Sequence, residues 1–115
     1  MSDKFLSMCG LARRAGKIII GTNMSVAAIR GNVKPCLVVL SSDASENSVK
    51  KINDACRFHN VEIISSVYSM IELGISVGQN GGAACIAVTD DGFARKITQL
   101  YLETVADSRS SQEVK

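Results

Sequence analysis

Four short apolar runs recur along the chain, and segments with helical spacing of apolar residues separate them. The runs lie at residues 18–20, 36–40, 61–64 and 84–88. A short β-branched run favours a strand over a helix, and a continuously apolar run is typical of a strand buried on both faces. Because helices and strands alternate throughout, the pattern predicts an α/β fold: a three-layer α/β/α sandwich with a four-stranded mixed central sheet.

The helical segments begin and end at recognisable signals. Phe5, Cys9 and Ala12 recur at helical spacing, which predicts a first helix over residues 3–15. Two more helices are predicted over 22–30 and 66–74, and another runs to His59 from a cap at Asp43 or Ser45. The last is expected to start from a cap at Asp90 or Asp91, with four inward-facing residues: Phe93, Ile97, Leu100 and Tyr101.

The chain is long enough to build one hydrophobic core. With 115 residues, 46% of them hydrophobic, we expect one domain over residues 1–105 and a polar, flexible tail over 106–115. The N-terminal segment has no long apolar run before a small-residue cleavage site, and no stretch approaches the roughly 20 apolar residues that span a bilayer. We therefore expect a cytoplasmic monomer with no membrane partner.

Residues that commonly serve catalysis or metal binding are few and scattered. Four cysteines, at 9, 36, 56 and 85, form no C-x-x-C pair, and the chain has one histidine. We interpret the cysteines as buried, reduced thiols, since the alternative, a zinc site, needs paired ligands. His59 is interpreted as a surface cap at a helix end rather than a catalytic base, because no nucleophile pairs with it. We predict no catalytic residue, no metal site and no cofactor.

Charge is distributed unevenly along the chain. Residues 1–34 hold six basic groups against one acid, a formal charge of +5, whereas the remainder is −3. Such asymmetry favours a basic face that attracts an anionic partner. The alternative is that these charges lie at helix ends and serve solubility. The six basic residues are Lys4, Arg13, Arg14, Lys17, Arg30 and Lys34.

The segment Ala15–Gly31 concentrates the features of a binding site. Gly16 can take the left-handed conformation that ends a helix, and Gly21 lets the backbone turn sharply from a strand into the next helix. Thr22 or Asn23 is expected to cap that helix while facing solvent. Helix N-termini attract anions, so this corner is a candidate phosphate site. Beside it we expect a cationic collar of Arg13, Arg14, Lys17 and Arg30.

Four stretches, taken in order, resemble one known family. They are FLSMCGLARRAGKIIIG, LVVLSSDASENS, ELGISVG and AVTDDGFARK. Their order and spacing over nearly the whole chain are similar to those of the RNA-binding ribosomal proteins of the L7Ae and L30e type, above all the small bacterial members. The resemblance implies the sandwich fold predicted above and a non-enzymatic, RNA-binding function.

Members of that family typically bind kink-turns, in which an internal loop bends the RNA sharply and stacks tandem sheared G·A pairs. The resemblance implies contact through Gly21, Thr22 and Asn23, where the glycine admits the RNA backbone and the side-chain amide reads guanine edges. Asn23 matches the amide of the family. Met24 stands at the position of its carboxylate, and Ala27 at that of its lysine.

A second contact implied by the resemblance is the loop over residues 79–84, where family members cover the flipped-out nucleotide of the bend. Gly82, Ala83 and Ala84 offer close backbone approach there, and a plain turn is the alternative. We therefore predict an RNA-binding protein that associates with structured RNA, including ribosomal RNA, and with the ribosome. The alternative from another class is a protein-interaction module, which exposed apolar residues such as Met24 at the helix start would favour.

Overall fold

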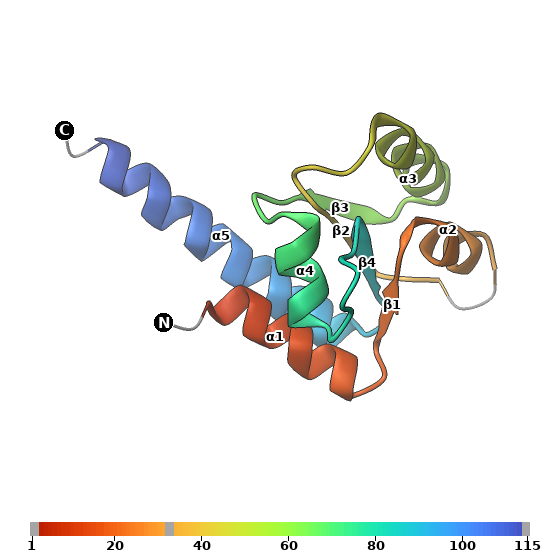
Figure 1. Ribbon diagram of the computed structural model, residues 1–115, viewed down its shortest axis with the longest axis horizontal. Coiled ribbons are helices and arrows are strands. Elements are labelled where there is room, and N and C mark those ends of the chain that lie inside the picture. The colour runs from red at the N-terminus through yellow and green to blue at the C-terminus, as the bar shows by residue number, and fades with distance from the viewer. Residues whose placement is uncertain (1–2, 32–33, 114–115) are drawn as a thin grey trace.

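Five helices alternate with four strands in the computed structural model, which describes residues 3–31 and 34–113 (Figure 1). One four-stranded sheet lies between two helical layers, so the predicted three-layer α/β/α sandwich is confirmed. The elements in chain order are α1 (Lys4–Arg14), β1 (Ile18–Ile20), α2 (Thr22–Arg30), β2 (Leu37–Leu40), α3 (Glu46–His59), β3 (Glu62–Ser65), α4 (Met70–Ser76), β4 (Cys85–Val88) and α5 (Asp91–Glu113).

The central sheet has the strand order β1-β4-β2-β3 and is mixed, as predicted. Strand β4 pairs antiparallel with β1 on one side and with β2 on the other, so that Val88 stands opposite Ile18 and Leu37. Strands β2 and β3 are parallel because α3 crosses over between them. In consequence, the C-terminal ends of β1, β2 and β3 and the N-terminal end of β4 lie at the same end of the sheet.

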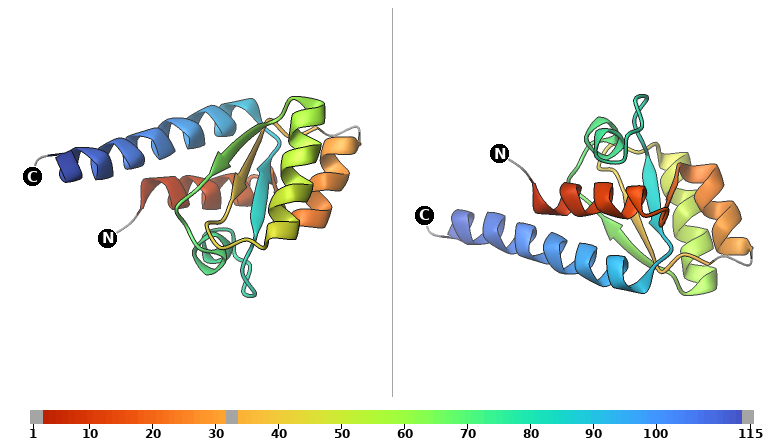
Figure 2. Two further views of the ribbon diagram at one scale, coloured as in Figure 1. Left: turned by 90° about the horizontal axis from the view of Figure 1, so that it is seen from above. Right: turned by 90° about the horizontal axis from the view of Figure 1, so that it is seen from below.

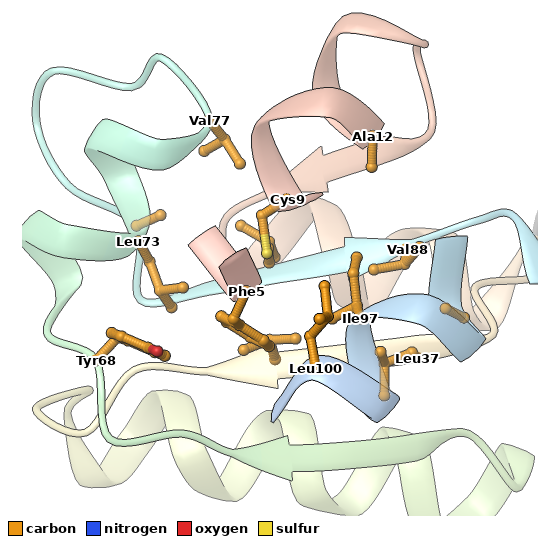
Figure 3. Close-up of a cluster of buried hydrophobic side chains, with 14 residues drawn as sticks. Phe5, Cys9, Ala12, Leu37, Tyr68, Leu73, Val77, Val88, Ile97 and Leu100 are labelled. Atoms are coloured by element: carbon orange, nitrogen blue, oxygen red, sulfur yellow. The ribbon is translucent and has the colours of Figure 1, made fainter. Parts of the chain in front are cut away.

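Two apolar clusters hold the layers together, one on each face of the sheet. Leu37 and Val39 of β2 pack with α1, α4 and α5, whereas the intervening Val38 packs with α2 and α3. Burial on both faces explains why the central strands are continuously apolar. Figure 3 shows the first cluster, where the rings of Phe5 and Tyr68 stack with their centroids 5.1 Å apart.

The strands agree with their predicted positions to within one residue, and the helix predicted over 66–74 is present as α4, but its predicted bounds were wrong. The helix begins only at Met70, because Ser69 and Glu72 form a capping box there, and it continues through Gly74 to Ser76. Gly74 therefore does not end the helix. A side chain at this position would place its Cβ 2.6 Å from the Cα atom of Gly82, so the glycine allows close packing.

The caps of α3 and α5 follow the sequence signals in part. Ser45 caps α3 and Asp90 caps α5, both as predicted. Asp43, the other candidate for α3, instead accepts a hydrogen bond of 2.8 Å from the first backbone N–H of α4. At the end of α3 the cap is Asn60, in the left-handed conformation, rather than His59.

Helix α5 packs on the sheet through its first half. The four residues predicted to face inward contact the first cluster, and the helix continues to Glu113, extending beyond the sheet in Figure 1. The domain over residues 1–105 and the flexible tail over 106–115 stay predictions. Neither α5 nor another helix of the described residues is long and apolar enough to cross a membrane.

Candidate functional site

One end of the sheet brings together the segments for which the sequence predicts binding. Gly21 donates its N–H to the carbonyl of Cys85 at 2.9 Å, and Ser41 donates to the carbonyl of Ala84 at 2.8 Å. The loops that follow β1, β2 and β3 therefore surround the loop that precedes β4. We call this region the corner end, and it comprises residues 21–24, 41–46, 66–72 and 77–84.

Helix α2 begins at the corner end without a side-chain cap. Its N-cap is Gly21, at φ 99° and ψ 157°, a conformation that residues with a side chain rarely adopt. The prediction of a cap at Thr22 or Asn23 is wrong, because the helix already starts at Thr22. The other four helices each have a side-chain cap, namely Asp3, Ser45, Ser69 and Asp90. The first N–H groups of α2 have no such partner among the described residues, which leaves them able to bind a ligand.

The first turn of α2 is divided between the core and solvent. Ser25 is fully buried, with its Oγ atom 3.7 Å from the Sγ atom of Cys85. Burial raises the pKa of the Cys85 thiol, so the contact is made by a neutral group. Thr22 is half-buried, whereas Asn23 and Met24 are exposed. The buried serine thus anchors the helix start on β4 and leaves the amide and the thioether in solvent.

The loop before β4 packs closely along α4 and reaches the corner end beside α2. Ala83 donates its N–H to a carbonyl of α4 at 2.9 Å, and its side chain is buried. Gly82 and Ala84 are half-buried. Ala84 directly precedes Cys85, whose carbonyl accepts the N–H of Gly21, whereas the side chain of Ala83 belongs to the core. The exposed part of the loop is residues 78–81.

The predicted cationic collar does not surround this corner. Lys17 lies at the other end of β1, where its carbonyl accepts a hydrogen bond of 2.9 Å from the first residue after β4. The extended strand places Lys17 roughly 13 Å from Gly21, and Arg13 and Arg14 precede it in the last turn of α1. Arg30 is the last residue of α2, roughly 12 Å along the helix from its start. The expected collar lies at the opposite end of the sheet.

Charge therefore separates the two ends of the sheet. The opposite end, which we call the basic end, comprises residues 13–17, 30–31, 34–36, 57–62 and 89–91. Its basic residues are Arg13, Arg14, Lys17, Arg30, Lys34 and Arg57, against the acids Glu62, Asp90 and Asp91. The corner end has no lysine or arginine and contains the acids Asp43, Glu46 and Glu72. In the left view of Figure 2, α2 and α3 run side by side in one direction, and the loop before β4 projects at the end where they begin.

The cysteines follow the predicted burial in three positions. Cys9, Cys56 and Cys85 are buried, and burial raises the pKa of Cys9 to about 12 and that of Cys56 to about 11. The prediction was wrong for Cys36, which is half-buried at the basic end, where it lines a cavity of about 580 Å³ between the sheet and α5. Among the described residues, no three metal-ligating side chains are placed to hold an ion.

Sequence reasoning missed one exposed aromatic residue, Phe58. Its side chain is 83% exposed in the last turn of α3, and its ring makes a T-shaped contact with that of His59 at a centroid distance of 5.0 Å. The signal was present in the sequence. The inward-facing stripe of α3 comprises Val49, Ile52, Ala55 and Cys56, and Phe58 lies off this stripe.

The fold and the corner end can be compared with known proteins. The model of the Ribosomal protein L7Ae/L30e/S12e/Gadd45 family matches residues 3–98. The chain belongs to this family. The matched segment contains all four strands and the whole corner end, so the family membership predicted from the four sequence stretches is confirmed.

Relatives within the L7Ae/L30e group cover most of the chain. The RNA-binding protein YlxQ of Bacillus subtilis (strain 168) is 38% identical over 97 residues, which make up 84% of this chain and 94% of the relative. The protein of the same name from Enterococcus faecium is 35% identical over 98 residues, 85% of this chain and 91% of the relative.

Two solved structures share the fold. A protein with unknown function from Bacillus halodurans superposes with a TM-score of 0.79 at 34% identity, covering 87% of this chain and 98% of that one. The 15.5kD RNA binding protein of Giardia lamblia superposes with a TM-score of 0.70 over 92% of each chain. At 18% identity, this second similarity concerns the fold alone.

Proposed function

We propose that this protein binds RNA through the corner end and recognises a kink-turn-like bend. Its family membership and the names of its two bacterial relatives as RNA-binding proteins support the choice of RNA. The main structural observation in favour of the corner end as the binding surface is the uncapped start of α2. There, free backbone N–H groups, the exposed amide of Asn23 and the glycine backbone at Gly21 meet in one place.

The chemistry of this surface suits base edges better than phosphates. Asn23 offers two N–H donors and a carbonyl acceptor, which can bond to a base edge in pairs. The acids of the corner end and its lack of lysine and arginine disfavour close phosphate contact. Internal loops of bent RNA expose base edges that a duplex hides. Preferential binding to the bent form then stabilises the bend.

The loop before β4 supplies the second contact in this proposal. Cys85, the first residue after this loop, accepts a hydrogen bond from Gly21 at the start of α2. A Cβ at Gly81 would meet no atom within 4 Å, so an RNA strand can approach the backbone of the loop closely. We include structured ribosomal RNA and the ribosome among the partners, and we propose that the protein acts in the cytoplasm as a monomer without catalysis. Co-sedimentation with ribosomes from a lysate, compared before and after RNase treatment, tests the ribosomal part.

A protein-interaction module on the same fold is the second candidate. Met24 is 64% exposed and Ala27 is exposed one turn later, so an apolar strip starts at the helix N-terminus. A thioether accepts hydrogen bonds from guanine N–H groups poorly, whereas methionine adapts well to protein partners. In this candidate, Asn23 contributes a rim contact and does not discriminate among RNAs.

The substitution Asn23→Ala tests the proposed function. Losing a paired contact to a base costs roughly 1–3 kcal/mol of discrimination, so a gel shift should show a roughly tenfold to hundredfold loss of affinity for a kink-turn RNA. A plain duplex of equal length should bind as before. Asn47→Ala, which removes an exposed amide from the first turn of α3, is the matched control and should retain the wild-type affinity.

Unchanged kink-turn affinity in Asn23→Ala would show that the start of α2 does not read the RNA. The interaction module would then take precedence. Equal losses in Asn23→Ala and Asn47→Ala would instead show that recognition is spread over both helix starts.

A further inference from the structure

The exposed ring of Phe58 lies beside a cavity at the basic end. This cavity, about 470 Å³ in volume, is lined by Arg30, Asp54, Ala55, Phe58 and His59. Helices α2 and α3 pack side by side in the same direction (Figure 2). Arg30, at the C-terminal end of α2, therefore lines the same cavity as Phe58, near the C-terminal end of α3. The ring of His59 makes its T-shaped contact with the Phe58 ring at the border of the cavity.

The other aromatic residues of the chain all pack against the core. Of three phenylalanines and two tyrosines, Phe5 and Tyr68 are buried, and Phe93 and Tyr101 pack against the same cluster. Burying a phenylalanine side chain stabilises a protein, yet Phe58 of α3 is exposed to solvent. A single exposed apolar residue needs no explanation by itself. Phe58 is a candidate binding residue because its ring borders a cavity that also contains Arg30.

We propose that Phe58 and Arg30 form a second RNA site, which takes an unpaired nucleotide with its base stacked on the Phe58 ring and its phosphate at Arg30. The site rests on the proposed function only in that its ligand is RNA. Aromatic rings stack on every base, and arginine binds phosphate with paired N–H donors. Asp54, the acid of the cavity, can accept a hydrogen bond from an N–H group on the base edge, such as N3–H of uracil.

A single strand fits this site better than a duplex or a protein. A duplex hides the base faces that the ring needs. Only two apolar residues, Phe58 and Ala55, line the cavity. Their combined surface is far smaller than the roughly 800 Å² per partner that a standard protein interface buries. The six basic residues of the basic end exceed its three acids and attract a polyanion. Since the corner end lies at the other end of the sheet, the ligand is a single-stranded flank rather than the bend itself.

The substitution Phe58→Trp gives a direct readout, because the chain contains no tryptophan. Stacking of a base on the indole should quench its fluorescence in a saturable way during titration with a ten-nucleotide oligouridylate, and added salt should weaken the binding. Leu102→Trp, at a position 63% exposed on α5, is the control and should show no saturable quenching. Absence of quenching at position 58, or equal quenching at both positions, would overturn the proposal.

The substitution Phe58→Ala tests the energetic role of the ring. It should weaken binding of the oligouridylate roughly fivefold to a hundredfold, with an unchanged melting temperature because the side chain is exposed. Arg30→Gln should lower the salt slope by about one unit. Wild-type affinity in Phe58→Ala would refute the site. So would a smaller oligomer in that variant, which would assign Phe58 to a contact between copies of the chain.

The two RNA sites can fail separately. Asn23→Ala should alter binding of the kink-turn only, and Phe58→Ala binding of the single strand only. If Asn23→Ala contradicts the corner-end proposal, the proposal for Phe58 still holds. If Phe58→Ala contradicts the second site, the corner-end proposal still holds.

Discussion

The corner end and the basic end differ in what they offer a partner. The corner end offers backbone N–H groups, the Asn23 amide and glycine backbone, and its charged residues are acids. The basic end offers arginine and lysine side chains and the exposed Phe58 ring. Groups suited to reading bases and groups suited to attracting phosphates are therefore held apart. Lys17 and Asn23 are close in the sequence, yet they belong to different surfaces.

Helix direction accounts for much of this separation. Helices α2, α3 and α4 all begin at the corner end, and acids such as Glu46 and Glu72 lie in first turns, where the helix dipole favours them. Arg13, Arg14 and Arg30 lie in last turns, where cations are favoured. The alternative explanation of the charge asymmetry, that charges follow helix ends, thus describes the structure well. The case for RNA depends on the family and on the uncapped start of α2 rather than on net charge.

Thiol reactivity should give the largest difference between the two ends. Raised pKa values of about 12 for Cys9 and about 11 for Cys56 reduce the thiolate fraction in native protein roughly a hundredfold to a thousandfold. Cys36 at the basic end should react much faster than Cys85 beneath the corner end. A time course of alkylation at pH 8, followed by mass spectrometry in native and unfolded protein, measures all four. Equal native rates at Cys36 and Cys85 would contradict the difference in burial.

The substitution Gly74→Ala should damage the corner end selectively. The new Cβ would lie 2.6 Å from Gly82 and 2.7 Å from the carbonyl of Gln79, so the loop before β4 must move. Overpacking of this kind costs roughly 1–3 kcal/mol of unfolding free energy, which urea titration can measure. Gly81→Ala is the control, because its Cβ meets no atom within 4 Å, and it should change stability by less than about 0.5 kcal/mol. Similar losses in both variants would mean that the loop is not packed as described.

The substitution Met24→Glu should sharpen the difference between the ends. A carboxylate at the start of α2 can accept hydrogen bonds from guanine N–H groups, so kink-turn affinity should rise roughly threefold to tenfold. Binding of single-stranded RNA at the basic end should not change. Met24→Gln, which has the same shape without the charge, is the control and should gain less. A fall in kink-turn affinity would show that phosphates rather than bases lie nearest to this position.

The substitution Lys17→Gln should have the smallest effect and should act at the basic end. Removing one phosphate contact there should weaken binding of single-stranded RNA about twofold to fivefold and reduce its salt slope by up to about one unit. The preference for a kink-turn over a duplex should persist. Lys51→Gln, at an exposed position in the middle of α3, is the control. A salt slope that stays the same would mean that Lys17 faces away from the RNA.

Local patterns in the sequence carried most of the fold. The run at residues 18–20 predicted a strand because it is β-branched and too short for a helix, and the run at 36–40 because a strand buried on both faces is continuously apolar. Asp90 was one of two residues predicted to cap the last helix, from its place before a helical stripe. The predicted end of α4 was wrong because a glycine can serve packing as well as termination. Only the contact of Gly74 with Gly82 distinguishes these two roles.

The sequence by itself determined the strand and helix order, the family and the residues at the start of α2. Only the tertiary structure decided which groups share a surface. A strand and a helix are rigid spacers, so β1 and α2 carry Lys17 and Arg30 away from Asn23. The parallel packing of α2 and α3, in turn, brings Arg30 to Phe58. The separation of two residues along the chain does not predict whether they share a surface. That depends on how the strands pair and on which ends of the helices lie together.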